Sequence, residues 1–178
     1  YDSELIDRLP KATEYRATVP AGTKSATGGT LAESVSWTFK TPPPKIVKSY
    51  PDGSPQPLEP LFFILFDQRI EPSAVMKTIQ VIAGSRDVEI VLASQTEIDK
   101  DARVSQLAKD SPEGRWLAFR ATQSFPTETN ISVNVGPDTP SAEGPLTTTE
   151  TQTFSFSTYA PLRIDDYRCS WYDDKCPP

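Results

Sequence analysis

Hydrophobic and polar residues alternate over several short segments of this chain. Apolar side chains occupy every second position over 15–19, 37–39, 131–135 and 154–156. Alternation with a period of two places these side chains on one face of a β-strand, so each segment is predicted to be a strand with one buried face. Residues 61–66 form a continuous apolar run instead, which predicts a strand in the core.

The alternating segments occur as two similar pairs, each joined by a loop rich in Gly, Ser, Thr and Pro. The matched loop residues, 116 positions apart, are Thr23 with Thr139, Ser25 with Ser141, Ala26 with Ala142, and Gly28 with Gly144. The matched residues of the second strand, 117 positions apart, are Trp37 with Phe154, Phe39 with Phe156, and Thr41 with Thr158. A period of this size fits a whole Ig-like domain, so the ending of a sandwich domain is predicted to occur twice.

The repeat divides the chain into three predicted parts. Residues 43–160 hold about seven short strands separated by turn signals, which predicts a complete Ig-like β-sandwich. Residues 1–42 are expected to be the C-terminal part of a preceding Ig-like domain, and residues 161–178 a linker or the start of a following domain. The prolines over 42–44 fit a stiff connector, because consecutive prolines favour extended geometry. The predicted fold class is all-β, with Ig-like sandwich domains in tandem.

Two segments carry helical signals. Residues 94–110 are polar and rich in helix formers without a clean apolar stripe, so we expect a surface insertion with a short helix and a solvated charged face. Residues 73–76 are expected to form a single helical turn, with Ser73 as its N-cap. Residues 88–92 are expected to form one short strand.

Composition excludes several function classes. The 178 residues carry a formal net charge of -6, and such a field repels a phosphate backbone, so no nucleic-acid partner is predicted. No run of 18 apolar residues is present, so no membrane span is predicted. The absence of histidine excludes a Ser-His-Asp triad and a zinc site built with histidine. No signal peptide is visible at the start, which resembles the interior of a longer polypeptide.

The two cysteines, Cys169 and Cys176, lie near the C-terminus. They lack the further ligands of a metal site and the two-residue spacing of a redox motif. Two alternatives remain, a local disulfide and two free thiols; the disulfide is favoured and implies an oxidising compartment. Trp171 lies between the cysteines and is the candidate interface residue, because it is the aromatic side chain expected to be exposed.

The remaining acidic and aromatic residues predict no chemistry. The acidic pairs at 165–166 and 173–174 point to opposite sides of an extended segment, which suits solvation better than a shared proton. The acids considered for calcium, Glu97, Asp99, Asp101 and Asp173, lack the spacing of an EF-hand. Trp37 and Trp116 occupy alternating strand positions and are predicted to be core residues. The sequence therefore predicts no catalytic residue, no metal and no cofactor, and a protein that is not an enzyme.

Three segments together resemble the N-terminal half of bacterial alpha-2-macroglobulins. They are the apolar strand that ends in an acidic turn and a proline over 62–72, the loop over 135–146, and the C-terminal region over 154–177 with its Cys-Ser-Trp-Tyr-Asp-Asp-Lys-Cys segment. The resemblance covers most of residues 15–178. Members of that family are large periplasmic proteins, often lipid-anchored, that contain many macroglobulin-like sandwich domains.

The resemblance implies a scaffold role. Family members trap proteases: a protease cuts a bait segment, and the multi-domain shell then rearranges around it. Many members also use a Cys-x-Glu-Gln thioester, but neither Cys169 nor Cys176 precedes Glu-Gln, so that function does not carry over. The implied partners are other domains of the same polypeptide and, through the full-length protein, proteases. The implied location is periplasmic or at the cell surface, with any membrane anchor outside this chain.

A second hypothesis is an Ig-like adhesion or carbohydrate-binding module of a bacterial surface protein. The flanking sequence discriminates the two: a bait region and a Cys-x-Glu-Gln motif favour the first hypothesis, and surface anchors with many identical repeats favour the second. An enzyme ranks third, because without histidine a nucleophile–base pair requires lysine or carboxylates.

Overall fold

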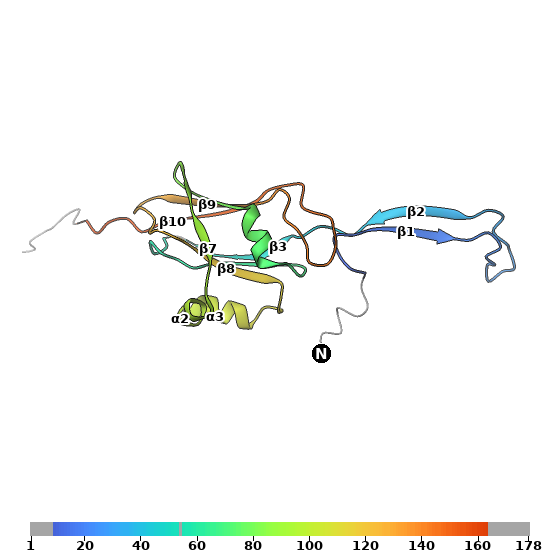
Figure 1. Cartoon of the computed structure of the whole chain (residues 1–178), viewed down its shortest axis with the longest axis horizontal. Helices are drawn as coiled ribbons and strands as arrows, with labels where there is room; N and C mark the ends of the chain where they lie inside the picture. Colours follow the sequence, from blue (N-terminus) through green and yellow to red (C-terminus); the bar gives the residue numbers. More distant parts are fainter. Residues whose placement is uncertain (1–8, 54, 164–178) are drawn as a thin grey trace, which may run out of the picture.

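The computed structural model describes residues 9–53 and 55–163. These residues form a β-sandwich and a long β-hairpin that projects from one end of it (Figure 1). The hairpin consists of β1 (Glu14–Val19) and β2 (Val35–Lys40), and the other described strands belong to the sandwich. The predicted fold class, an all-β sandwich with a short helical insertion, is confirmed.

One sheet of the sandwich has the strand order β10-β9-β5-β6, with every pairing antiparallel. Its strands are β5 (Ile79–Ala83), β6 (Arg86–Val88), β9 (Asn130–Val135) and β10 (Gln152–Ser157). Alternate residues of β5 and β9 are buried, and the residues between them are more exposed. The alternation in the sequence therefore marks the face that this sheet turns toward the core.

The other sheet has the strand order β3-β4-β8-β7, also antiparallel throughout. Its strands are β3 (Ile46–Tyr50), β4 (Phe62–Phe66), β7 (Ile90–Leu92) and β8 (Trp116–Ala121). β4 lies between β3 and β8, and four of its five residues are buried. A continuous apolar run fits this position because both faces of β4 are covered, one by the opposite sheet and one by helices.

The chain crosses from one sheet to the other at Glu89. β6 pairs with β5, whereas β7, which is separated from β6 by Glu89 alone, pairs with β8. The expectation of a single strand over 88–92 was therefore wrong. The sequence alone could not show the division, because the residues on the two sides of Glu89 find their hydrogen-bond partners in different sheets.

Two apolar clusters occupy the two faces of β4. Between the sheets, Phe62 stacks on Phe119 with ring centroids 4.7 Å apart and meets Phe156 at 5.7 Å. On the opposite face, Phe63 stacks on Trp116 at 5.4 Å beneath the helices. Trp116 thus packs against a core cluster, as the alternation predicted.

The helical insertion consists of two helices, α2 (Gln95–Lys100) and α3 (Ala102–Lys109). Ser94 and Glu97 form a reciprocal capping box at the start of α2. Asp101 ends α2 in an extended conformation, and its carboxylate accepts the backbone N–H groups of Arg103 and Val104 at 3.0 and 2.9 Å. One acidic residue therefore divides the predicted short helix into two. The buried helix residues, which face β4 and β8, are Ile98, Val104 and Leu107.

A shorter helical turn joins β4 to β5. It comprises α1 (Pro72–Val75) and the 3₁₀ turn η2 (Met76–Thr78). Glu71, not Ser73, precedes the first helical residue, so the expected N-cap was misplaced. Pro72 begins the helix because the first helical position needs no backbone N–H. Ser73 instead donates its hydroxyl to Glu71 Oε1 at 3.1 Å.

Candidate interaction surfaces

The candidate residues at the C-terminus, Cys169, Trp171 and Cys176, lie outside the described residues. The predicted disulfide and the predicted interface tryptophan therefore remain predictions. Among the described residues, three other features are candidates for an interaction surface. They are the β1–β2 hairpin, the junction at its base, and a polar groove beside the helices.

The β1–β2 hairpin repeats the β9–β10 hairpin strand for strand. Both are antiparallel, and the two registers are the same once the repeat offset is applied. The apolar-face pairs are Tyr15 with Phe39, Ala17 with Trp37 and Val19 with Val35 in β1–β2, and Ile131 with Phe156, Val133 with Phe154 and Val135 with Gln152 in β9–β10. The repeat inferred from sequence is thus also a repeat of backbone pairing.

The bases of the two hairpins share the same hydrogen bonds. Thr41 donates its backbone N–H to Thr13 O at 2.9 Å and accepts the N–H of Thr13 on its hydroxyl at 3.0 Å. Thr158 and Thr129 make the same two bonds, each at 3.0 Å. Because each threonine hydroxyl fixes the backbone where its hairpin begins and ends, the two hairpins start from the same geometry.

The residues beside these threonines also correspond. Ala12 and Glu128 both adopt a left-handed conformation, with φ of 52° and 51°. Each donates its backbone N–H to a carbonyl just after the second strand, Ala12 to Pro42 at 3.0 Å and Glu128 to Tyr159 at 2.9 Å. A non-glycine residue rarely adopts this conformation, so its occurrence at both bases marks one shared structural unit.

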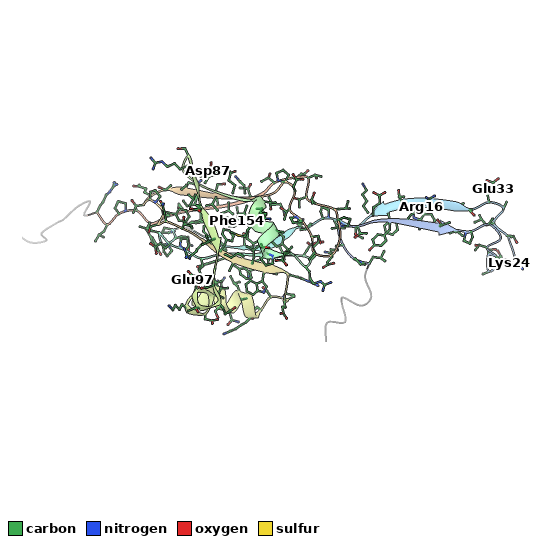
Figure 2. The ribbon with its side chains drawn as sticks, in the orientation of Figure 1. Arg16, Lys24, Glu33, Asp87, Glu97 and Phe154 are labelled. Atoms are coloured by element: carbon green, nitrogen blue, oxygen red, sulfur yellow. The ribbon has the colours of Figure 1, made fainter. Side chains whose placement is uncertain are left out.

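The two hairpins differ in what covers them. In β9–β10, Phe156 is 2% exposed and lies between the sheets. In β1–β2, Trp37 is 50% exposed and Phe39 is 39% exposed. Figure 2 shows Phe154 within the sandwich and Arg16 on the projecting hairpin. The expectation that Trp37 is a core residue does not hold among the described residues, because no second sheet packs on its face.

The base of the hairpin is packed against the sandwich. The N–H of Leu146 donates to Ala12 O at 2.8 Å, and Ala12 is fully buried. A Cβ at Gly144 would fall within contact distance of Thr13 Oγ1 and of the carbonyl oxygens of Lys11 and Ala12. Such close approach of two backbones requires the missing side chain of glycine.

Charged groups hold the same junction. Lys11 Nζ lies 2.6 Å from Asp67 Oδ2, in an ion pair that is three-quarters buried. Glu143 accepts the backbone N–H of Lys11 at 3.3 Å with one oxygen and that of Arg69 at 2.8 Å with the other. One carboxylate therefore ties the hairpin base to the turn after β4.

Asp67 is held in its charged form. Burial by itself raises the pKa of Asp67, but hydrogen bonds from Lys11, from the backbone N–H of Lys45 and from Gln68 outweigh it and hold the pKa below its ordinary value. Gln68 is itself fully buried and accepts the hydroxyl of Ser141 at 2.8 Å. The junction is therefore a connected polar network, in which Lys11 and Asp67 form an ion pair and Glu143 accepts two backbone N–H groups.

A polar groove of about 560 Å³ lies between the α2–α3 insertion and the loop after β8. Within it, Arg120 Nε lies 2.6 Å from Glu97 Oε1. Hydrogen bonds from Ser94, and then from Arg120, lower the pKa of Glu97 to about 2. A carboxylate that is ionised at neutral pH and already serves as a helix cap and an ion-pair partner is poorly suited to act as a general acid.

Three of the acids considered for calcium serve structural roles, and the fourth, Asp173, lies outside the described residues. Glu97 and Asp101 cap helices, and Asp99 accepts the side-chain amide of Gln95 at 2.8 Å. Within the described ranges, no three residues of the types His, Cys, Asp and Glu are grouped to hold a metal ion. Over the same ranges, no helix has both the length and the apolar character that a membrane span requires.

Sequence reasoning found the hairpin but missed the junction. Lys11, Asp67 and Glu143 are distant in sequence and carry no motif. Gly144 was matched to Gly28 in the repeat, which indicated a shared turn but not a close contact with the residues before β1. Its role at the junction was visible only when the hairpin base and the loop after β9 were placed together.

Comparisons with known proteins return a low structural similarity. No protein-family model matches the chain, and no curated protein matches it. Among solved structures, the N-terminal part of the bacterial S-layer protein SbsC aligns with a TM-score of 0.39 and 13% sequence identity. The alignment covers 67% of this chain and 24% of that chain.

Proposed function

We propose that this chain is a non-catalytic scaffold module of an extracytoplasmic, protease-trapping protein of the alpha-2-macroglobulin type. The observation that supports the scaffold role is the β1–β2 hairpin, which repeats the closing hairpin of the sandwich and is fixed by its base to that sandwich. The protease-trapping part of the proposal rests on the sequence resemblance of residues 62–72, 135–146 and 154–177 to that family. A hairpin that belongs to one sandwich and is anchored on the next would hold two domains in a defined orientation. That is the task of a scaffold.

The connector after β2 is also anchored. Pro44 is buried, and its carbonyl accepts the side-chain amide of Gln152 at 3.3 Å. The same Gln152 accepts the backbone N–H of Ile46 at 2.8 Å. Together with the Lys11–Asp67 ion pair, these contacts restrict rotation about the connector. They favour a rigid connection between the hairpin and the sandwich and disfavour a flexible tether.

The proposed partners are the other domains of the same polypeptide and, through the full-length protein, proteases. No nucleic-acid partner is proposed, because the net charge of -6 repels phosphate. The proposed compartment is the periplasm or the cell surface, where the predicted Cys169–Cys176 disulfide would persist. Any membrane anchor is proposed to lie outside residues 1–178.

Rigid coupling is tested by the distance between the hairpin tip and the sandwich. Spin labels at E33C and D87C, with Cys169 and Cys176 replaced by serine, report this distance by pulsed electron resonance; Figure 2 labels both native side chains. We expect one narrow distance distribution. The variant K11M should broaden it, whereas E14Q, which removes an exposed ion pair within the hairpin, should not. A broad distribution in the parent chain would overturn the scaffold role.

Protease trapping is tested on the full-length polypeptide that carries this chain. A protease enclosed in a shell keeps its active site but cannot reach large substrates. We therefore expect an added endopeptidase to lose activity on a protein substrate while it still cleaves a small chromogenic peptide. Equal loss of both activities, or loss of neither, contradicts trapping. Hydrolytic turnover by the purified 178-residue chain itself would contradict a non-catalytic role.

A carbohydrate-binding adhesion module is the second candidate. It is favoured by the exposed aromatic side chains of the hairpin, where Tyr15 stacks on Phe39 at 5.5 Å beside the half-exposed Trp37. Glycan-array binding that is lost in W37A and kept in T38A, a change on the opposite face, would support this candidate. Absence of binding by the parent chain would exclude it for the glycans on the array.

A further inference from the structure

We infer that the apolar face of the β1–β2 hairpin is the inner surface of a second β-sandwich, covered by a four-stranded sheet of the β3-β4-β8-β7 type. This surface, here called the hairpin face, consists of Tyr15, Ala17, Val19, Val35, Trp37 and Phe39. The inference rests on the proposed scaffold function and specifies the partner: a β-sheet of an adjoining sandwich of the same topology, carried by the same polypeptide.

The sandwich itself shows what covers such a face. In β9–β10, Ile131 and Val133 are fully buried, and Phe156 lies 5.7 Å from Phe62 of the opposing sheet. The hairpin face has the same register and the same base geometry, so its side chains leave the backbone in the same directions. An opposing sheet placed as in residues 43–160 would therefore meet Phe39 and its neighbours as Phe62 meets Phe156.

The two faces of the projecting hairpin are segregated by polarity. The face opposite the hairpin face carries Glu14, Arg16, Thr18, Ser36, Thr38 and Lys40. Glu14 and Lys40 pair there at 3.2 Å, with both side chains at least half exposed. Complete separation of apolar and polar residues is the pattern of a sheet with one face in a core and the other in water.

An uncovered two-stranded hairpin is an unfavourable structure. In water such a hairpin is marginally stable by itself, and three or more strands or a packing partner are needed to hold it. An exposed aromatic and aliphatic face also favours association. A covering sheet resolves both problems, because it buries Trp37 and Phe39, which are 50% and 39% exposed.

The outer edge of β1 extends the correspondence. In the sandwich, β9 pairs on one side with β10 and on the other with β5, where Val81 lies opposite Val133. Among the described residues β1 pairs with β2 alone. Because Ala17 corresponds to Val133, the other edge of β1 is expected to receive a strand of the β5 type centred on Ala17. One difference removes a polar contact: Val35 stands where β10 has Gln152, so the hydrogen bond that Gln152 accepts from Ile46 has no equivalent in β1–β2.

The test supplies the missing layer. In an extended chain, a second copy of residues 43–125 is fused directly to Pro10 in place of residues 1–9. Pro10 is the repeat equivalent of Pro126, so the second copy precedes the β1–β2 hairpin as residues 43–125 precede the β9–β10 hairpin. Hydrogen exchange of the amides over 14–19 and 35–40 is then measured by mass spectrometry. We expect these amides to exchange at least about tenfold more slowly than in the parent chain, because a covered hairpin opens less often. The original sandwich, unchanged in the same molecule, serves as the folding control.

Matched substitutions distinguish the two faces. In the extended chain, F39D should abolish the slowing, whereas T38D on the polar face should leave it in place. A second extended chain also carries Y15I, A17V and W37F, which give the hairpin the side chains of β9–β10 at these positions. The added sheet, which normally packs on β9–β10, then meets side chains that it fits. Slowed exchange in either extended chain that F39D abolishes supports the inference, and unchanged exchange in both overturns it.

Two further outcomes are decisive. If the parent chain sediments as a dimer that F39D dissociates and T38D does not, the occupant is a second copy, and the inference is wrong. The spin-label distance of the parent chain separates this inference from the scaffold proposal. A narrow spin-label distance distribution in the parent chain, with unchanged amide exchange in both extended chains, refutes the second sandwich but not the scaffold role. A broad distribution with slowed amide exchange refutes rigid coupling but not the second sandwich.

Discussion

Asp67 accepts hydrogen bonds from both parts of the chain, so it determines how firmly the hairpin base is held. Its pKa is held below the ordinary value of 3.8, although burial acts in the opposite direction. A depressed folded-state pKa means that the stabilisation is present above the unfolded pKa and is lost as the pH falls through the folded pKa. The junction should therefore be stable at neutral pH and loosen below about pH 3.8.

The variant D67N tests this role. It keeps the shape of the side chain but removes the charge that pairs with Lys11, so we expect a loss of about 1–3 kcal/mol in the free energy of unfolding at pH 7. The difference from the parent should shrink as the pH falls below about 3.8 and Asp67 of the parent becomes protonated. Denaturant titrations at several pH values measure both effects. E14Q, at an exposed ion pair, is the control and should cost less than about 1 kcal/mol.

Gly144 is the second residue on which the junction depends. In G144A the added methyl group would meet the backbone oxygens of Lys11 and Ala12, which cannot move without displacing the hairpin base. We expect a loss of about 1–3 kcal/mol, the usual cost of overpacking. G53A, in an open loop with no atom near the added methyl group, is the matched control. Equal thermal midpoints for the two variants would show that the junction tolerates the methyl group.

At the scale of elements, Asp101 gives the helical insertion its shape. It ends α2 and caps α3 through two hydrogen bonds. D101A removes the carboxylate oxygen that accepts both hydrogen bonds and should destabilise the insertion by about 0.5–2 kcal/mol, the range for loss of an N-cap. Exchange of the α3 amides should accelerate accordingly. D99A, at an exposed helix position, is the control, and equal exchange in the two variants would rule out the capping role.

The two hairpins provide a second test at this scale, because they share a hydrogen-bond register and differ in their cover. Amide exchange depends on how often hydrogen bonds open, and burial of the flanking side chains opposes opening. In the parent chain, amides over 14–19 and 35–40 should exchange at least about tenfold faster than those over 130–135 and 152–157. Equal protection would mean that the hydrogen bonds alone determine stability.

At the scale of the whole molecule, equivalent phenylalanines in the two copies of the repeat should contribute differently to the free energy of unfolding. F156A leaves a cavity between the sheets and should cost about 3–5 kcal/mol in the free energy of unfolding. F39A, at the equivalent position of the projecting hairpin, should change unfolding of the sandwich by less than about 0.5 kcal/mol, as expected for a surface change. Denaturation followed by the fluorescence of Trp116, with Trp37 and Trp171 replaced by phenylalanine in the parent and in both variants, measures both effects. A large effect of F39A would mean that the hairpin contributes to the core of the sandwich.

Residue order by itself determined the strands, the fold class and the repeat. Alternation at residues such as Ile131 and Val133 is a local property, and the apolar run at Phe62 to Phe66 requires burial wherever the strand lies. The matched residues from Thr23 to Thr41 and from Thr139 to Thr158 reproduced the same backbone pairing because register follows from the apolar pattern. The helical insertion was likewise predictable from its polar, helix-forming composition.

The tertiary structure alone decided the contacts between distant segments. Lys11, Asp67 and Glu143 met because the hairpin base, the turn after β4 and the loop after β9 converge at one end of the sandwich. The division of one strand at Glu89 followed from competition between two sheets for its hydrogen bonds. The exposure of Trp37 was decided in the same way, since alternation specifies which face is apolar but not which layer covers it. Local patterns determine what a strand can bury, and only the arrangement of the layers decides what it does bury.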